Sequence, residues 1–581
     1  MIKPPRKEEV SSMQHIKPIP IGVEFYQEMI EEEYYYIDKT LLIRDLLVNK
    51  NKVTVFTRPR RFGKTLAQSM LKAFFEKKIL PDGTVADNSV YFQGKKIMEA
   101  GVEYTRHMGQ YPVIFLSLKS AKQPTYEMAY ENLTFEIRKE YDRHRYILEN
   151  DNLTEEDKKI YQSILAMEAG NTIVARAIAF LSECLEKYHK QKVIILLDEY
   201  DVPLENAYFN SFYDKMVSFI RSLFESALKT NESLKMAVVT GCLRISKESI
   251  FTGLNNLKIV SVLDESYAEY FGFSQDEVDV FLETYDIMQK KEEVKKWYDG
   301  YIFGNIEIYN PWSIINYIYD VTHRNTEFPK PYWSNTSSNS IVRELIENAD
   351  DNTKQELERL IAGGTIEKPI HEDITYEDIY KFQDNLWNFL FFTGYLKTVE
   401  KSFIGQQIYM AMKIPNEEIS YIYKNNIREW FLQCIGKQDL SGLVKALEEG
   451  DCETASDIIT GQLMDTISFY DYKEDYYHGF IAGLLRNNNK YIIKSNRESG
   501  SGRYDLTLKT KRIRKGRAII LECKVAESIN KLEKGCMEAL EQIEKLHYDN
   551  DMVEEGYTDI LKYGICFYKK ECFVMNHVTT N

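Results

Sequence analysis

A glycine, a lysine and a threonine stand in succession as Gly63, Lys64 and Thr65, directly after a short apolar run. Residues 53–56 are typical of a strand and residues 64–77 of a helix, so the three residues occupy a strand-to-helix turn. Backbone N–H groups at such a helix start attract polyphosphate. Lys64 would reach the β- and γ-phosphates of such a polyphosphate, and the Thr65 hydroxyl would hold Mg²⁺. The residues expected to surround the phosphates are Arg58, Pro59, Arg60, Arg61, Phe62, Gly63, Lys64 and Thr65.

Two acidic residues favour the same chemistry. Asp198 and Glu199 follow a continuous apolar run at 193–197, which is typical of a strand buried on both faces of a parallel sheet. Acids at the C-terminal end of such a strand lie where α/β sheets hold ligands. Asp198 would hold Mg²⁺ through its hydration shell, and Glu199 would polarise the attacking water. Taken alone, the Gly-Lys-Thr motif could be a turn without a ligand, and the two acids could simply mark the end of a buried strand. The two motifs together favour a nucleotide site.

A third apolar strand, residues 235–241, carries Thr240 near its end, where a hydroxyl could sense a γ-phosphate. Arg244 follows closely and could neutralise phosphate charge, in its own chain or across a subunit boundary. A surface ion pair explains Arg244 equally well. Arg58 departs from the usual phosphate-loop pattern, because a glycine commonly stands there.

A second group of reactive side chains lies near the C-terminus. Residues 503–508 alternate like a strand, residues 517–524 form a second one, and the polar segment between them predicts an antiparallel hairpin. Asp505 then lies opposite Glu522, and Lys524 shares a face with Glu522. Two carboxylates and a lysine could bind Mg²⁺ or Mn²⁺ and orient a water for attack on a phosphodiester. The simpler alternative is a cross-strand salt-bridge network.

Charge supports a nucleic-acid substrate for that hairpin. Eleven Lys and Arg residues lie within 485–517 against two acids, Glu498 and Asp505, in a chain with a net charge of −15. A basic stretch beside a metal site suits a phosphate backbone, DNA in the first instance, although a solvated hairpin face would look similar. Glu474 opens a predicted helix beside the hairpin and could add a third acid to the metal site.

Bulk properties bound the remaining possibilities. A chain of 581 residues should hold several domains, and its longest apolar runs are too short to cross a bilayer, so we expect no membrane partner. The eight cysteines form no Cys-x-x-Cys pair and the nine histidines are dispersed, which predicts no zinc site. Cys523 and Cys566 lie within apolar strands, as reduced thiols of a cytoplasmic protein would.

Several motifs together resemble the bacterial AAA-ATPase-like proteins that carry a C-terminal PD-(D/E)XK nuclease-superfamily domain. The matching segments are 58–65, 36–40, 197–201, 240–244, 297–301, 309–313, 477–480, 495–500 and 522–524. The resemblance covers nearly the whole chain, and it makes Arg58 a trait of the family. It implies an α/β protein with a P-loop NTPase core on a parallel sheet, a helical or winged lid, a helical connector and a restriction-endonuclease-like α/β domain. It assigns the nuclease roles to Asp505, Glu522 and Lys524, with Glu474 and Gln542 as accessories.

The expected organisation has five parts. They are an entry segment at 1–50, the ATPase core at 51–260, the lid at 261–330, the connector at 331–460 and the nuclease-like domain at 461–581. The leading hypothesis is an ATP-hydrolysing protein that gates a Mg²⁺- or Mn²⁺-dependent DNA nuclease, acting on foreign or mobile DNA. The alternative is a nucleotide-controlled switch or assembly protein whose nuclease fold only binds nucleic acid. A third hypothesis is a structural scaffold in which both sites are inactive. The protein could also form a homo-oligomer, which the sequence does not decide.

Overall fold

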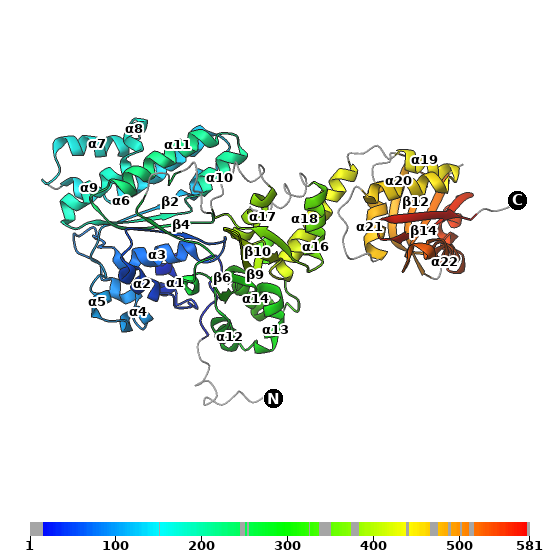
Figure 1. The fold of residues 1–581 in the computed structure, drawn as a ribbon, viewed down its shortest axis with the longest axis horizontal. Helices are drawn as coiled ribbons and strands as arrows, with labels where there is room; N and C mark the ends of the chain where they lie inside the picture. Colours follow the sequence, from blue (N-terminus) through cyan, green and yellow to red (C-terminus); the bar gives the residue numbers. More distant parts are fainter. Residues whose placement is uncertain are drawn as a thin grey trace, which may run out of the picture. The chain divides into compact units, whose positions relative to one another are not determined.

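The computed structural model describes residues 16–149, 151–243, 250–251, 255–324, 326–335, 350–372, 383–436, 441–464, 474–485, 490–499, 502–510 and 516–577. The chain is an α/β protein and divides into two compact units (Figure 1). The N-terminal unit comprises Met1–Thr336 and Thr365–Ser420, and the C-terminal unit comprises Ser337–Gly364 and Tyr421–Asn581.

A five-stranded parallel sheet forms the centre of the N-terminal unit. Its order is β2-β3-β4-β1-β5, with bounds β1 Val53–Thr57, β2 Val113–Ser117, β3 Val193–Asp198, β4 Leu234–Gly241 and β5 Leu257–Val260. Every side chain of β1 and β3 is buried, which explains their uninterrupted apolar sequences. Thr57 pairs with Gly241 and Leu197 with Val239, so β1, β3 and β4 end at the same edge of the sheet.

Helices cover both faces of this sheet (Figure 1). One group, drawn in blue below the sheet, comprises α1 Tyr26–Glu31, α2 Leu41–Asn49, α3 Lys64–Phe75, α4 Lys96–Glu99 and α5 Val102–Thr105. The other group, drawn in cyan above the sheet, comprises α6 Tyr126–Arg143, α7 Glu155–Leu165, α8 Asn171–Val174, α9 Ala177–His189, α10 Val202–Phe209 and α11 Tyr213–Phe224. Alternation of strands and helices produces this layered arrangement.

Two smaller modules complete the N-terminal unit. The first contains α12 Gln275–Thr284, α13 Lys291–Tyr298, the hairpin β6 Tyr301–Phe303 and β7 Ile306–Ile308, and α14 Pro311–Arg324. The capping box of Ser274 and Glu277 at the start of α12 is present as the sequence predicts. The second contains α17 Gln383–Phe392 and an antiparallel sheet of β8 Ile366–Pro369, β9 Lys397–Ile404 and β10 Gln407–Lys413. These three strands interrupt the stretch for which the sequence predicted a helical connector.

The C-terminal unit is built on a mixed sheet of order β11-β12-β13-β14-β15. The strands are β11 Tyr491–Ser499, β12 Gly502–Thr510, β13 Arg517–Val525, β14 Asp559–Tyr568 and β15 Glu571–Asn576. Leu506 pairs with Leu521 in the antiparallel β12–β13 ladder, so the predicted register is confirmed. The parallel β13–β14 pair is linked through α22 Leu532–Lys545 and α23 Asn550–Glu554.

The remaining helices surround that sheet or precede it. They are α16 Asp351–Ile361, α18 Glu417–Gly436, α19 Ser441–Glu449, α20 Cys452–Met464 and α21 Glu474–Leu485. Side chains of α19, α20 and α21 join those of the sheet in one apolar core. Within the described ranges, no helix combines the length and apolarity that a bilayer crossing needs.

Candidate nucleotide and metal sites

The loop between β1 and α3 ends in its one glycine, Gly63, which sets the backbone conformation at the start of the helix. Gly63 precedes the first residue of α3 with φ of 82°, a left-handed conformation that costs glycine little and other residues more. Gly63 is exposed, and the first N–H groups of a helix such as α3 have no partner within the helix. This is the local geometry that a phosphate group requires.

A chain of hydrogen bonds connects the helix with two strand ends. The Thr65 hydroxyl donates to Asp198 Oδ2 at 2.7 Å, and the Thr240 hydroxyl donates to Asp198 Oδ1 at 2.6 Å. Gln68, one turn further along α3, donates through Nε2 to Thr240 Oγ1 at 3.2 Å. Asp198 is 1% exposed, and burial together with the charge of Glu199 raises its pKa to about 6. A hydroxyl and a carboxylate held in contact are hard oxygen ligands that suit Mg²⁺.

Lys64 lies against its own loop. Its Nζ donates to the carbonyl oxygens of Arg58 and Pro59, both at 3.2 Å, and to Cys242 Sγ at 3.4 Å. The Glu199 carboxylate is 4.0 Å away. Burial opposes the charged amine, but the surrounding groups, led by Cys242 and Glu199, raise the pKa of Lys64 above its ordinary value. The ammonium therefore stays charged at the place where a phosphate would approach.

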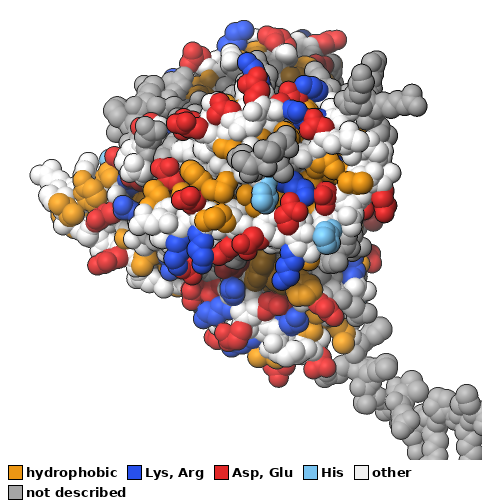
Figure 2. All heavy atoms as spheres, turned by 90° about the vertical axis from the view of Figure 1, so that its right-hand side faces the viewer, with side chains coloured by type: hydrophobic (Ala, Val, Ile, Leu, Met, Phe, Trp, Pro, Cys, Tyr) orange, Lys and Arg blue, Asp and Glu red, His pale blue; other side chains and the backbone are white. Residues whose placement is uncertain are grey.

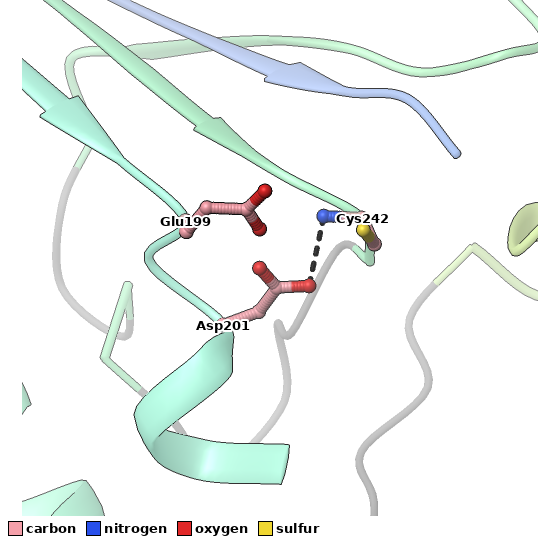
Figure 3. Close-up of side chains that lie close together, drawn as sticks. All are labelled: Glu199, Asp201 and Cys242. Atoms are coloured by element: carbon pink, nitrogen blue, oxygen red, sulfur yellow. Dashed lines mark hydrogen bonds between the residues drawn. The ribbon is translucent and has the colours of Figure 1, made fainter. Parts of the chain in front are cut away.

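Glu199 and Asp201 form a tight turn after β3. Glu199 has φ of 55°, a strained left-handed conformation for a residue with a side chain, and such strain is common at functional sites. Asp201 Oδ2 accepts a hydrogen bond from the backbone N–H group of Cys242 at 2.8 Å (Figure 3) and another from that of Leu243 at 3.2 Å. The Tyr200 hydroxyl donates to the Leu243 carbonyl. This turn therefore fixes the backbone that follows β4.

Three residues of this centre received no role from the sequence: Gln68, Asp201 and Cys242. Asp201 belongs to the segment 197–201 that matched the family, and that position was the available signal. Burial and the Glu199 charge raise the pKa of Asp201 to about 6, and burial raises the pKa of the Cys242 thiol to about 12.

Arg58 does not face the phosphate position. Its side chain is fully buried, and Nη1 donates to the carbonyl oxygens of Thr57 and Val260, both at 3.0 Å. The guanidinium lies 5.4 Å from the Phe271 ring and 5.0 Å from the Phe303 ring. Burial lowers its pKa to about 9, which leaves it charged at neutral pH. The sequence placed Arg58 among the phosphate ligands; its side chain instead connects the loop to Val260 of β5 and to the rings of Phe271 and Phe303.

The other loop side chains are also engaged by protein. Arg60 forms an ion pair with Glu205, and the Arg61 guanidinium lies 4.1 Å from the Trp312 ring. Phe62 is fully buried, and Pro59 is also buried. These residues would meet a phosphate through their backbone N–H groups, except Pro59, which has none.

Two expected site residues cannot be placed. Arg244 lies outside the described residues. Glu474 belongs to α21, but its side chain is likewise outside the described part of the chain.

The second site lies in the C-terminal sheet. Asp505 Oδ2 accepts from the Cys523 N–H at 2.8 Å, and Glu522 Oε2 accepts from the Asp505 N–H at 3.3 Å. Glu522 is 1% exposed, and Lys524 Nζ lies 3.7 Å from its Oε1. Gln542 on α22 donates to the same Oε1, as its accessory assignment anticipates. The two carboxylates, the lysine and the glutamine are thus gathered around adjacent positions of β12 and β13.

Further support for this site comes from α21 and from the segment after α22. His478 Nε2 is 2.8 Å from the Asp505 carbonyl oxygen. Gln542 Nε2 also donates to the hydroxyl of the buried Tyr548 at 3.1 Å. Outer contacts of this kind orient metal-binding carboxylates.

The basic stretch 485–517 is partly compensated by acids. Lys490 pairs with Glu448, Lys509 with Glu555 at 2.7 Å, and Arg517 with Asp559 at 2.7 Å. The side chains of Arg486, Arg497, Arg503, Lys511, Arg512, Arg514 and Lys515 lie outside the described residues. On the face drawn in Figure 2, acidic and basic side chains are interspersed.

Comparisons with known proteins match the two regions of the chain that contain these candidate sites. The model of a family described as "Predicted AAA-ATPase" matches residues 20–251, and that of the PD-(D/E)XK nuclease superfamily matches residues 472–577. A protein of Azotobacter chroococcum mcd 1, described as an uncharacterized protein in the vnfD 5' region, is 24% identical over 528 residues. That match covers 88% of this chain and 90% of the relative. The chain therefore joins an AAA-ATPase-like region to a C-terminal domain of the PD-(D/E)XK nuclease superfamily.

Proposed function

We propose that this protein binds and hydrolyses ATP with Mg²⁺ in its N-terminal unit, and that the nucleotide state gates a metal-dependent DNA nuclease in its C-terminal unit. Foreign or mobile DNA is the proposed target. The observation that carries the proposal is the contact of Thr65 with Asp198 at the start of α3, beside a charged Lys64. The domain pairing of ATPase and nuclease families supports the coupling.

The ATPase half assigns a task to each group at the sheet edge. Thr65 and Asp198 would hold Mg²⁺, which when bound neutralises charge on the β- and γ-phosphates. Lys64 would leave the carbonyl oxygens of Arg58 and Pro59 and turn to the phosphates, since its ammonium is already charged. Glu199 would orient the attacking water, because its carboxylate is the partly exposed acid of this centre.

The nuclease half rests on the pair Asp505 and Glu522. Their oxygens are hard ligands that fit Mg²⁺ or Mn²⁺, and Gln542 fixes the orientation of Glu522. Lys524 is positioned to hold a water or stabilise negative charge on a phosphodiester. The Lys and Arg residues of 485–517 are the proposed contact with the DNA backbone.

The test uses the purified full-length chain with plasmid DNA, Mg²⁺ and ATP. Lys64→Ala should abolish ATP hydrolysis and the ATP dependence of cleavage. Asp505→Asn should abolish cleavage while sparing hydrolysis. Asp559→Asn, a carboxylate change on the same sheet at the Arg517 ion pair, is the matched control and should still cleave. Equal nicking by wild type and Asp505→Asn would refute the nuclease assignment.

One observation favours a second function, a nucleotide-controlled switch that only binds nucleic acid. The buried Arg58 and the ring of Pro59 stiffen the loop, and Arg58 ties it to the lid aromatic Phe303. A stiff loop connected to the lid would report nucleotide binding without fast turnover. ADP retained through purification, with nucleotide-dependent assembly and no cleavage, would favour this alternative.

A further inference from the structure

Three residues from two segments of the chain, the turn after β3 and the end of β4, bring potential metal ligands together beside the loop between β1 and α3. Glu199 follows β3, Asp201 precedes α10, and Cys242 follows β4 (Figure 3). One carboxylate oxygen of each acid and the Cys242 Sγ all lie within 4.8 Å of one another. Asp201 and Cys242 are buried, and Glu199 is partly exposed, so the cluster is accessible from one side.

An unsatisfied oxygen points into this cluster. Asp201 Oδ2 is held by the N–H groups of Cys242 and Leu243, but Oδ1 is buried without a hydrogen-bond partner among the described residues. Figure 3 shows this second oxygen turned towards Glu199. Asp201 is only 2% exposed, so solvent does little to compensate the oxygen. A bound cation would stabilise this buried carboxylate oxygen, which otherwise has the cost of an unsatisfied acceptor.

The nearby cation is the ammonium of Lys64. Its Nζ lies 3.4 Å from Cys242 Sγ and 4.0 Å from Glu199 Oε1. One ammonium faces two carboxylates and a thiol, so the negative charge is incompletely balanced. If Lys64 turns to a phosphate, the cluster loses this counter-charge altogether.

We propose that Glu199, Asp201 and Cys242 form a binding site for a thiophilic divalent cation such as Zn²⁺, occupied in alternation with the ammonium of Lys64. A thiolate, two carboxylate oxygens and a water would complete the tetrahedral set that zinc adopts. Mg²⁺ prefers oxygen ligands only, so the thiol selects against it. Binding exchanges the thiol proton for the metal and releases one H⁺ per ion.

The consequence for the chain is inhibition. A cation bound by Glu199 removes that carboxylate from its proposed part in orienting water, and its charge repels the ammonium of Lys64. This consequence rests on the proposed ATPase function, whereas the binding of the cation does not. The experiment below therefore measures binding first and hydrolysis second.

Co²⁺ is the probe, because a cobalt–thiolate bond gives a charge-transfer absorption that oxygen ligands at Asp505 and Glu522 do not. Full-length protein without nucleotide is titrated with Co²⁺ and then with competing Zn²⁺. Cys242→Ser removes the thiolate, Glu199→Gln weakens the site independently, and Cys184→Ser is the control at another buried thiol. Circular dichroism verifies that each variant is folded.

Wild type and Cys184→Ser should show the thiolate band, and Cys242→Ser should lose it. Glu199→Gln should weaken binding by more than the roughly 10–100-fold that loss of an outer contact costs. Lys64→Ala should tighten binding by about tenfold or more, because like charges roughly 4 Å apart repel even in water. Zn²⁺ at the measured affinity should then inhibit wild-type ATP hydrolysis.

A thiolate band absent from wild type, or unchanged in Cys242→Ser, would overturn the site. Unchanged affinity in folded Glu199→Gln would do the same. Unchanged affinity in Lys64→Ala would overturn the alternation with the lysine. If the cation binds as expected but wild type hydrolyses no ATP, the proposed hydrolysis is refuted and the cation site is not. If wild type hydrolyses ATP and bound Zn²⁺ does not slow it, the inhibition is refuted.

Discussion

Replacing Asp201 by asparagine should stabilise the N-terminal unit at neutral pH. The asparagine Oδ1 can keep the hydrogen bonds from the Cys242 and Leu243 N–H groups, while its Nδ2 replaces the unpartnered oxygen and faces Glu199. The substitution therefore removes a buried charge and keeps the shape of the turn. Natural proteins commonly retain such a destabilising charge where it takes part in a functional site.

The magnitude follows from the pKa of Asp201, which rises from 3.8 to about 6 because of burial and of Glu199. Each pKa unit corresponds to about 1.4 kcal/mol, so ionised Asp201 costs about 3 kcal/mol. Between pH 3.8 and about pH 6 the folded state binds more protons at Asp201 than the unfolded state does. The free energy of unfolding of wild type therefore falls as the pH rises through this range. Asp201→Asn should thus raise the free energy of unfolding by about 3 kcal/mol at pH 8 and by about half that at pH 5. The attraction between Asp201 and Lys64 is already contained in this pKa, which Lys64 lowers against the larger effect of burial.

Calorimetry of the full-length chain at both pH values measures this effect. The transition of the N-terminal unit should shift upward by about 4 °C at pH 8 and by about half as much at pH 5. Asp142→Asn, at an exposed ion pair with Arg145, is the control and should shift Tm little at either pH. A lower Tm for Asp201→Asn at pH 8, or an equal gain at both pH values, would refute the reasoning.

Three further outcomes are expected. Arg58→Gly should lower the free energy of unfolding by about 3–5 kcal/mol, because it leaves a cavity and unpaired carbonyl groups. Arg58→Met fills most of that cavity and should cost less. Urea unfolding measures both losses, and equal losses would contradict the role of Arg58 as a buried anchor. Gln542→Leu should weaken Mn²⁺ binding roughly 10–100-fold by releasing Glu522, as calorimetric titration would measure; unchanged affinity would show that Gln542 does not orient the acid. Ser274→Ala should cost about 1 kcal/mol through the lost cap of α12, and an unchanged Tm would count against it.

The elements with strong local signals were predictable from sequence. Uninterrupted apolar runs identified β1 and β3, because strands buried on both faces need no polar positions. Alternation on both sides of a polar turn fixed the register of β12 with β13, and so placed Asp505 opposite Glu522. Ser274 and Glu277 marked a helix start through a hydrogen-bond pattern that spans three residues.

Features that depend on distant contacts were not predictable. The role of Arg58 is set by Val260, Phe271 and Phe303, about two hundred or more positions later, and nothing near residue 58 reveals them. The strands β8 to β10 were missed within a stretch that was expected to be helical. Cys242 meets Asp201 only because β3 and β4 are neighbours in the sheet, so spacing rules for metal ligands could not find the cluster.

The interleaved path of the chain has a practical consequence for dissecting the protein. Thr365–Ser420 belongs with the N-terminal unit although Ser337–Gly364, which precedes it, belongs with the C-terminal one. A fragment ending near residue 336 would lack Gly394, whose added Cβ would lie 3.1 Å from Pro59 of the phosphate loop. A single proteolytic cut cannot separate two units whose segments alternate along the chain, so assays that separate the two proposed activities need point variants of the whole polypeptide rather than truncations.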